Sequence, residues 1–218
     1  MNKTEFFRRD HKSLQHWLEY TSDAYLDFLL SQLHTKKDEL TLDNGCGNGR
    51  FSIALGQEGA EVVALDVNVS LLKKAAAAAR EEMLDRQISF ILADMQNLPF
   101  KVGVFEKILC VHNLWYVPRY KMAVNEMFRT VRKNGEIVID HLNFLNFRVL
   151  LAWVQYVAAK ISRRRPAPVF YRSPYEILGP FASCQISVFS IVIGRKNRLY
   201  VMKGNNRFAS RLIIRCLK

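Results

Sequence analysis

Short apolar runs alternate with helical segments in the middle of the chain, and this alternation restricts the possible folds more than any other feature. The runs are four to eight residues long, rich in Val, Ile and Leu, and lie at 40–43, 61–67, 88–94, 105–112 and 135–142. Such runs are typical of strands buried on both faces of a sheet. The sequence therefore predicts an α/β fold with a parallel sheet and right-handed crossovers.

The helical segments carry recognisable end signals. Residues 70–84 include five consecutive alanines of high helix propensity, and Ser70 at their start has the chemistry of an N-terminal cap. Gly59 and Gly135 each follow a helical stretch, where glycine commonly ends a helix.

The alternation stops on both sides of residues 40–142. Apolar residues at three- and four-residue steps predict a helix over 11–33, and a long apolar stretch predicts another over 144–165, before two further strands. The length of 218 residues suits one domain. We expect a helical lid at 1–37, a cofactor-binding core at 38–142, a helical cap that forms an acceptor region at 143–181, and C-terminal strands at 182–218.

Positive charge is concentrated in the last third of the chain. Residues 141–218 contain 14 Lys and Arg and a single acid, Glu176, whereas residues 1–140 contain 18 basic and 19 acidic residues. This asymmetry favours an anionic partner such as phospholipid, nucleic acid or a phosphorylated substrate, with a merely solvated basic face as the alternative.

Three glycines, Gly45, Gly47 and Gly49, follow the first apolar run in LTLDNGCGNGRF. Glycine permits close approach of a ligand to the main chain, and the next helix offers free N–H groups. No Gly-Lys-Ser/Thr follows, and the spacing differs from the dinucleotide fingerprint. Asp43, directly before the turn, would repel a pyrophosphate and attract a cationic ligand.

Acidic residues also end the next two runs. Asp66 is placed to accept both hydroxyls of a ribose, and Asp94 to accept the exocyclic amine of an adenine, with Met95 packing on the ring. Three acids at the ends of three successive strands predict a nucleoside site with a cationic neighbour.

These motifs resemble a known family. DNGCGNG at 43–49, the two later strand-end acids, NLPF at 97–100 and VRKNGEIVI at 131–139 are similar to class I S-adenosylmethionine-dependent methyltransferases, of the small type 11-like kind that acts on quinones, sugars and lipids. The resemblance implies a Rossmann-like three-layer sandwich. Its seven-stranded, mostly parallel sheet would have an antiparallel last strand, with an N-terminal helix and a helical cap between strands 5 and 6.

The resemblance also implies an enzyme that uses S-adenosyl-L-methionine and releases S-adenosyl-L-homocysteine. Carried onto this sequence, the cofactor would contact Asp43, Gly45, Cys46, Gly47, Gly49, Asp66, Val67, Asp94, Met95 and Val111. No cysteine spacing indicates a metal site, so no metal is expected.

LCVHNLWYV, at the end of the fourth run, would lie beside the transferred methyl group. His112 is the candidate general base for an acceptor that must lose a proton, although hydrogen bonding to the cofactor or capping of the strand stays open. We expect Trp115, Tyr116, His141 and Arg172 around the acceptor, with His141 as a weaker second base.

The sequence predicts only the chemical class of the methyl acceptor. A small-molecule or lipid-linked acceptor, carrying an anionic group, is favoured over RNA because the Asn/Asp-Pro-Pro-aromatic run of amino-adenine methyltransferases is missing from the fourth strand end. A cofactor-binding relative without catalysis is the further alternative.

The predicted helix over 144–165 has three interpretations. It would lie on an anionic membrane surface through Arg163 to Arg165, cover the acceptor pocket, or form a homodimer. The charged start of the chain lacks the pattern of a secretory leader, so we expect a cytoplasmic protein that associates peripherally with the membrane if the first interpretation holds.

Overall fold

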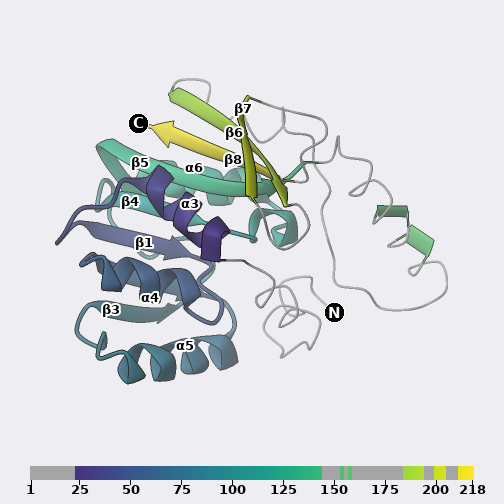
Figure 1. Ribbon diagram of the computed structural model, residues 1–218. Helices are drawn as coiled ribbons and strands as arrows, with labels where there is room; N and C mark the ends of the chain where they lie inside the picture. The colour runs from purple at the N-terminus through teal and green to yellow at the C-terminus, as the bar shows by residue number, and fades with distance from the viewer. Residues whose placement is uncertain (1–22, 144–152, 155–156, 159–183, 194–198, 205–210) are drawn as a thin grey trace.

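The computed structural model describes residues 23–143, 153–154, 157–158, 184–193, 199–204 and 211–218 (Figure 1). Nearly all of the helix expected over 144–165, and Arg172, lie outside these residues. Among the described residues, no helix combines the length and apolarity needed to cross a bilayer.

One mixed sheet organises the fold. Its strands are β1 (Leu40–Asn44), β2 (Glu61–Asp66), β3 (Ile88–Leu92), β4 (Phe105–Cys110), β5 (Val131–Leu142), β6 (Gln185–Ile193), β7 (Leu199–Lys203) and β8 (Arg211–Leu217), in the spatial order β3-β2-β1-β4-β5-β8-β6-β7. The first five strands pair in parallel, and β8 lies antiparallel between β5 and β6. The predicted mostly parallel sheet with an antiparallel last strand is confirmed.

Over the described residues the sheet has eight strands and not the predicted seven, and the additional strand is β7. β7 pairs antiparallel with β6 at the outer edge of the sheet (Figure 1). Edge strands need not carry the continuous apolar run of a strand buried on both faces, and the side chain of Val201 in β7 is 42% exposed. The strand does contain the short apolar run LYVM at 199–202, which the sequence prediction did not include.

Helices cover both faces of the sheet. α3 (Asp23–Leu33), α4 (Arg50–Gln57) and α5 (Val69–Glu81) pack on one face through apolar residues such as Leu29, Leu55 and Leu72. α6 (Tyr120–Thr130) packs on the other through residues such as Val124 and Met127. The result is the expected Rossmann-like three-layer sandwich.

Of the three residues predicted to mark helix ends, Ser70 and Gly135 have other roles in the structure. Gly59 does follow α4 with φ of 91°. The cap of α5, however, is Asn68, whose side chain accepts hydrogen bonds from the backbone N–H groups of Ser70 and Leu71. The N-cap lies two residues earlier than predicted, so Ser70 lies inside the first turn of α5.

Gly135 does not end a helix. α6 ends at Thr130, and Gly135 lies within β5. A Cβ at this position would come within 2.6 Å of Cγ2 of Val131 and 2.8 Å of the carbonyl oxygen of Glu106. The glycine is needed for close packing of β5 against β4, which a sequence pattern does not reveal.

Candidate active site

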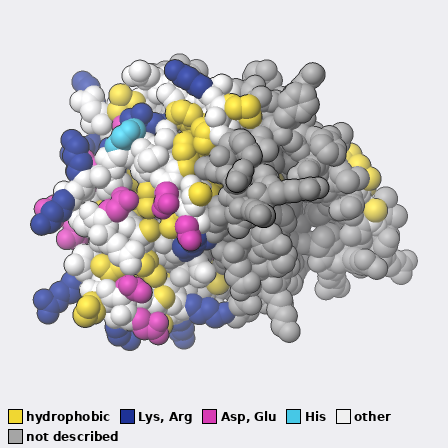
Figure 2. Space-filling model, viewed as in Figure 1, with side chains coloured by type: hydrophobic (Ala, Val, Ile, Leu, Met, Phe, Trp, Pro, Cys, Tyr) yellow, Lys and Arg dark blue, Asp and Glu magenta, His cyan; other side chains and the backbone are white. Residues whose placement is uncertain are grey.

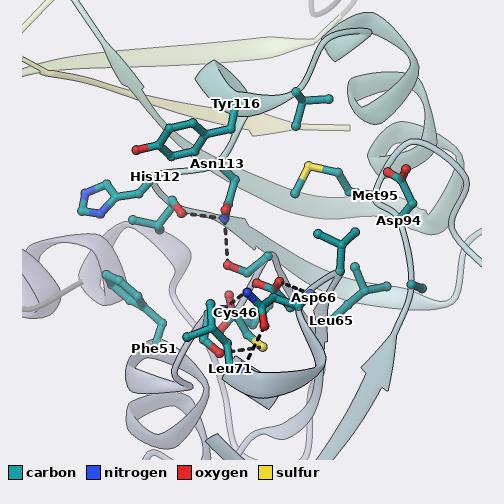
Figure 3. Close-up of a pocket in the computed structure, with 18 of the residues that line it drawn as sticks. Cys46, Phe51, Leu65, Asp66, Leu71, Asp94, Met95, His112, Asn113 and Tyr116 are labelled. Carbon is teal, nitrogen blue, oxygen red and sulfur yellow. Dashed lines mark hydrogen bonds between the residues drawn. The ribbon is translucent and has the colours of Figure 1, made fainter. Parts of the chain in front are cut away.

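A pocket formed by described residues lies at the carboxyl edge of the sheet, where β1, β2, β3 and β4 end. It is lined by Asp43, Gly45, Cys46, Gly47, Asn48, Arg50, Phe51, Leu65, Asp66, Val67, Asn68, Leu71, Ala93, Asp94, Met95, Gln96, Val111, His112, Asn113, Trp115, Tyr116 and Val117. Figure 3 shows Asp94 and Met95 at one end and Phe51, His112 and Tyr116 at the other, with Asp66 between them. The pocket therefore has Asp94 and Met95 at one end, Asp66 in its middle and aromatic side chains at the other end.

The side chain of Asn113 holds the glycine turn after β1 in place. Gly45 has φ of 92°, and a Cβ there would overlap the side-chain amide of Asn113. Nδ2 of Asn113 donates to the carbonyl oxygens of Gly45 at 2.8 Å and Val111 at 2.6 Å. Asn113 thereby joins the end of β4 to the turn after β1.

The family resemblance implied that Gly49 contacts the cofactor, but the structure places it outside the pocket lining. It is the N-cap of α4, with φ of 85°, and is not among the residues that line the pocket. A Cβ there would lie 2.8 Å from the Cβ of Ala75 in α5. In this structure Gly49 allows α4 and α5 to pack closely behind the pocket.

Asp43 is the most deeply buried acid of the pocket, at 2% exposure. Burial raises the pKa of Asp43 to about 7, and the charge of Asp66 acts in the same direction, while a 2.6 Å hydrogen bond from Oγ of Ser52 opposes the rise. Neither Ser52 nor Asp66 supplies a positive charge that would compensate the ionised carboxylate of Asp43. A ligand with a positive charge beside Asp43 would supply that charge.

Asp66 shapes the backbone around it with both carboxylate oxygens. Oδ2 accepts from the N–H of Gly47 at 2.9 Å, and Oδ1 accepts from the N–H of Asn68 at 2.8 Å. Burial raises the pKa of Asp66, and these hydrogen bonds oppose the rise. Each oxygen has a further lone pair, so the carboxylate can still accept from two adjacent hydroxyls of a ribose.

Asp94 is oriented by a residue that the sequence did not single out. The backbone N–H and Nε2 of Gln96 donate to Oδ1 of Asp94 at 2.9 and 3.0 Å. Gln96 is 7% exposed and lines the pocket next to Met95, which is 8% exposed. The two-residue spacing after a strand-end aspartate is a signal that would have found Gln96.

His112 marks the aromatic end of the pocket, directly after β4. Its Nε2 lies 2.9 Å from Oδ2 of Asp140, which is fully buried in β5. The ring stacks on Tyr25 of α3 and also contacts Trp115. The structure thus brings Trp115 and Tyr116 together with His112, and it adds Asp140 and Tyr25, which the sequence did not indicate.

His141 is placed away from the cavity surface. It is 1% exposed and its ring centroid is 6.1 Å from that of Trp115, but it is not among the residues that line the pocket. Alternation along β5 explains this, because Asp140 and His141 point to opposite faces of the sheet. Asp140 therefore contacts His112 in place of His141.

The remaining predicted cofactor residues all face the pocket. Cys46, Val67 and Val111 line it, and burial, followed by the charges of Asp43 and Asp66, raises the pKa of the Cys46 thiol well above its ordinary value. The thiol therefore stays protonated and serves as a small apolar wall.

Bare backbone, a buried acid that lacks a cation, and a central strand-end acid together fit an adenosine derivative with a positive charge. A Rossmann-like sheet with these groups at the ends of β1, β2 and β3 is the arrangement that the resemblance to S-adenosylmethionine-dependent methyltransferases implies. Residues 42–139 match the family model described as a methyltransferase domain. This part of the chain is therefore similar to methyltransferases.

A named relative and two solved structures show the same likeness. The ubiquinone/menaquinone biosynthesis C-methyltransferase UbiE of Rhizobium johnstonii is 29% identical over 122 residues, 53% of this chain and 47% of the relative. The chain spans about half the length of the curated relatives that it matches.

Among solved structures, a methyltransferase of Thermotoga maritima described as a possible histamine N-methyltransferase has a TM-score of 0.74 and 17% identity, over 99% of each chain. The geranyl diphosphate C-methyltransferase of Streptomyces coelicolor, solved with S-adenosyl-L-homocysteine, has a TM-score of 0.65 and 19% identity, over 93% of this chain and 80% of its own. At these identities the likeness shows the fold.

Proposed function

We propose that this protein transfers the methyl group of S-adenosylmethionine to a small-molecule or lipid-linked acceptor. The observation that carries the proposal is the pocket itself, which joins three strand-end acids to an aromatic end lined by Phe51, Trp115 and Tyr116. The acids suit the cationic nucleoside, and the aromatic end suits an apolar acceptor beside it. The names of UbiE and of the geranyl diphosphate enzyme agree with such an acceptor.

In this proposal the protein aligns the reactants and excludes water, because methyl transfer is an in-line displacement at the sulfonium carbon. The cofactor supplies the activated methyl group. Asp43 balances positive charge on the methionine part, Asp66 holds the ribose, and Asp94 with Met95 holds the adenine. His112 is the titratable group at the acceptor end.

Binding of S-adenosyl-L-homocysteine tests the first half of the proposal. We expect a rise in the unfolding temperature with increasing ligand, and Asp66→Ala should remove it because the ribose contact is lost. Glu58→Ala, at the C-cap of α4 and not among the residues that line the pocket, is the control and should respond like the unchanged protein. A protein whose unfolding temperature does not move at millimolar ligand would contradict the proposal.

A methyl-transfer assay tests the second half of the proposal, which concerns the acceptor. The protein is incubated with methyl-labelled S-adenosylmethionine and a fractionated lysate, and label is followed into lipids, small molecules, RNA and protein. Label in the lipid or small-molecule fraction supports the proposal, whereas label in RNA would replace it by the RNA methyltransferase alternative. Binding without label in any fraction would favour a non-catalytic relative.

The face of the molecule drawn in Figure 2 does not by itself favour nucleic acid. Figure 2 shows Lys and Arg side chains interspersed with Asp and Glu on this face, and a nucleic-acid site typically gathers basic side chains into one patch. An anionic group on the acceptor, contact of 144–165 with a membrane surface and homodimer formation stay parts of the proposal for the rest of the chain.

A further inference from the structure

The side chain of Gln96 bridges two elements at the end of the pocket where Asp94 and Met95 lie (Figure 3). Its Nε2 donates to Oδ1 of Asp94 at 3.0 Å and to Oδ2 at 3.1 Å. Its Oε1 accepts from the backbone N–H of Arg119, the N-cap of α6, at 3.3 Å. Gln96 therefore joins the carboxylate that follows β3 to the start of α6.

These two partners fix the direction in which the amide of Gln96 points. A reversed amide would place Oε1 against the carboxylate of Asp94 and the NH₂ group against the N–H of Arg119, so both contacts would become repulsive. Gln96 is also 7% exposed, and burial makes an unsatisfied amide costly. The side chain is thus held in one orientation, with its donor group toward Asp94.

The contact with both carboxylate oxygens goes beyond what the turn after β3 requires. The backbone N–H of Gln96 already donates to Oδ1 of Asp94 at 2.9 Å, which is a common turn contact of aspartate. The terminal torsion of an aspartate side chain is broad, and the additional contact from Nε2 to Oδ2 restricts it. A residue without a side-chain donor at position 96 would keep the turn contact and lose this restriction.

The carboxylate of Asp94 keeps room for one more hydrogen bond. From the described residues, Oδ1 accepts two hydrogen bonds and Oδ2 accepts one. Since each oxygen has two lone pairs, one acceptor position is left, and it lies on Oδ2. Both groups of Gln96 that contact the carboxylate are donors, which suits its ionised form, and an ionised carboxylate can only accept. This end of the pocket is therefore complementary to a ligand group that donates.

Two charged residues of α6 hold the next part of the segment. Oε2 of Glu126 accepts from the N–H of Leu98 at 2.8 Å. Arg129 donates to the carbonyl oxygens of Leu98 at 2.9 Å and Phe100 at 2.7 Å, and it binds Glu126 through two 2.7 Å contacts. The backbone after β3 is thus attached to α6 independently of the side chain of Gln96, so a substitution of Gln96 should act on Asp94 and leave the segment in place.

We propose, building on the cofactor site of the proposed function, that Gln96 is a positioning residue that determines the base specificity of this site. It orients Asp94 so that Oδ2 accepts a hydrogen bond from the exocyclic amine of adenine. A 6-oxopurine such as hypoxanthine has an oxygen at that position, which only accepts, so two acceptors would face each other. The site therefore selects a 6-aminopurine and rejects the 6-oxo analogue.

Isothermal titration with S-adenosyl-L-homocysteine and with S-inosyl-L-homocysteine measures this preference, because the two ligands differ only in the purine. We expect the unchanged protein to bind the adenine ligand about 10- to 100-fold more tightly, as for one hydrogen bond to a charged group. Gln96→Met has a similar length but no hydrogen-bonding group, and it should lower this ratio by about fivefold or more.

Gln57→Met is the matched control. Nε2 of Gln57, in α4, also donates to a carboxylate, Oε2 of Glu82, at 3.2 Å, but this contact is exposed and Gln57 does not line the pocket. The same substitution there removes the same kind of hydrogen bond, and the preference for the adenine ligand should stay that of the unchanged protein.

Asp94→Asn tests whether Gln96 acts through Asp94. The new amide can donate to the oxo group as well as accept from the amine, so the ratio of the two affinities should approach one. Addition of Gln96→Met to this variant should then leave the ratio unchanged, because the residue that Gln96 positions has lost its preference. A further change of the ratio in the double variant would contradict the positioning role.

The remaining outcomes separate this inference from the proposed function. Equal affinity of the unchanged protein for both ligands would refute the base specificity while cofactor binding stands. Equal weakening of both ligands in Gln96→Met would show a structural role only. If Gln96→Met does not fold, Gln96→Asn makes the same test, since its shorter amide cannot reach both Asp94 and Arg119. If the unchanged protein binds neither ligand, the proposed function fails first, and the inference fails with it.

Discussion

Oγ of Ser52 donates a 2.6 Å hydrogen bond to Oδ2 of Asp43 and so links the first turn of α4 to the end of β1. The acid remains difficult to ionise in spite of this bond, because burial raises its pKa to about 7. The end of β1 therefore holds a carboxylate that titrates near neutrality.

Binding of the cofactor should depend on pH through Asp43. If the cationic ligand prefers the ionised acid, its affinity should rise about tenfold between pH 6 and pH 8, since the ionised fraction rises by about that factor around a pKa of 7. Isothermal titration with S-adenosylmethionine measures this. Asp43→Asn should bind more weakly and lose the pH dependence; retention of the full dependence would assign it to another group.

Stability of the ligand-free protein should show the opposite trend. The folded-state pKa of Asp43 is raised above its ordinary value of 3.8, so its stabilising contribution is present below pH 4 and is lost as pH rises through about 7. In urea unfolding, Asp43→Asn should therefore be more stable than the unchanged protein at pH 8, with a smaller difference at pH 5. A variant less stable at pH 8 would contradict this burial cost.

The turn after β1 should not tolerate a side chain at Gly45. Gly45→Ala must keep a positive φ and also displace Asn113, so we expect a loss of about 2–4 kcal/mol in unfolding free energy and of ligand binding. Gly204→Ala is the matched control. Gly204 has φ of 90° with open space around its Cβ position, so only the backbone strain of about 1–2 kcal/mol should appear. Equal losses would show that the overlap with Asn113 relaxes freely.

The cap of α5 should depend on Asn68 and not on Ser70. Asn68→Ala removes the acceptor of two backbone N–H groups, and we expect a loss of about 1 kcal/mol, measured by chemical denaturation. Ser70→Ala should change the free energy of unfolding by less than about 0.5 kcal/mol, because the residue lies inside the first turn. A larger effect at Ser70 would contradict the cap seen in the structure.

Most of the sheet was predictable because its central strands are buried on both faces. That burial leaves continuous apolar runs in the sequence, and β1 to β5 begin within a few residues of the predicted positions. β7 contains only the short apolar run LYVM at 199–202, which was not predicted as a strand. The cap at Asn68 was missed because Asn and Ser are both good caps and only the backbone geometry selects between them.

The sequence alone determined the order of strands and helices and the acids that follow the first three strands, because local spacing and turn chemistry are enough for both. Only the tertiary structure decided that Asp140 from β5 meets His112 from β4 and that Gly49 serves the packing of α4 against α5. These relationships depend on which residues the packed elements bring next to one another. A shift of one residue along β5 would have placed His141 where Asp140 lies, and no pattern within a single strand records that choice.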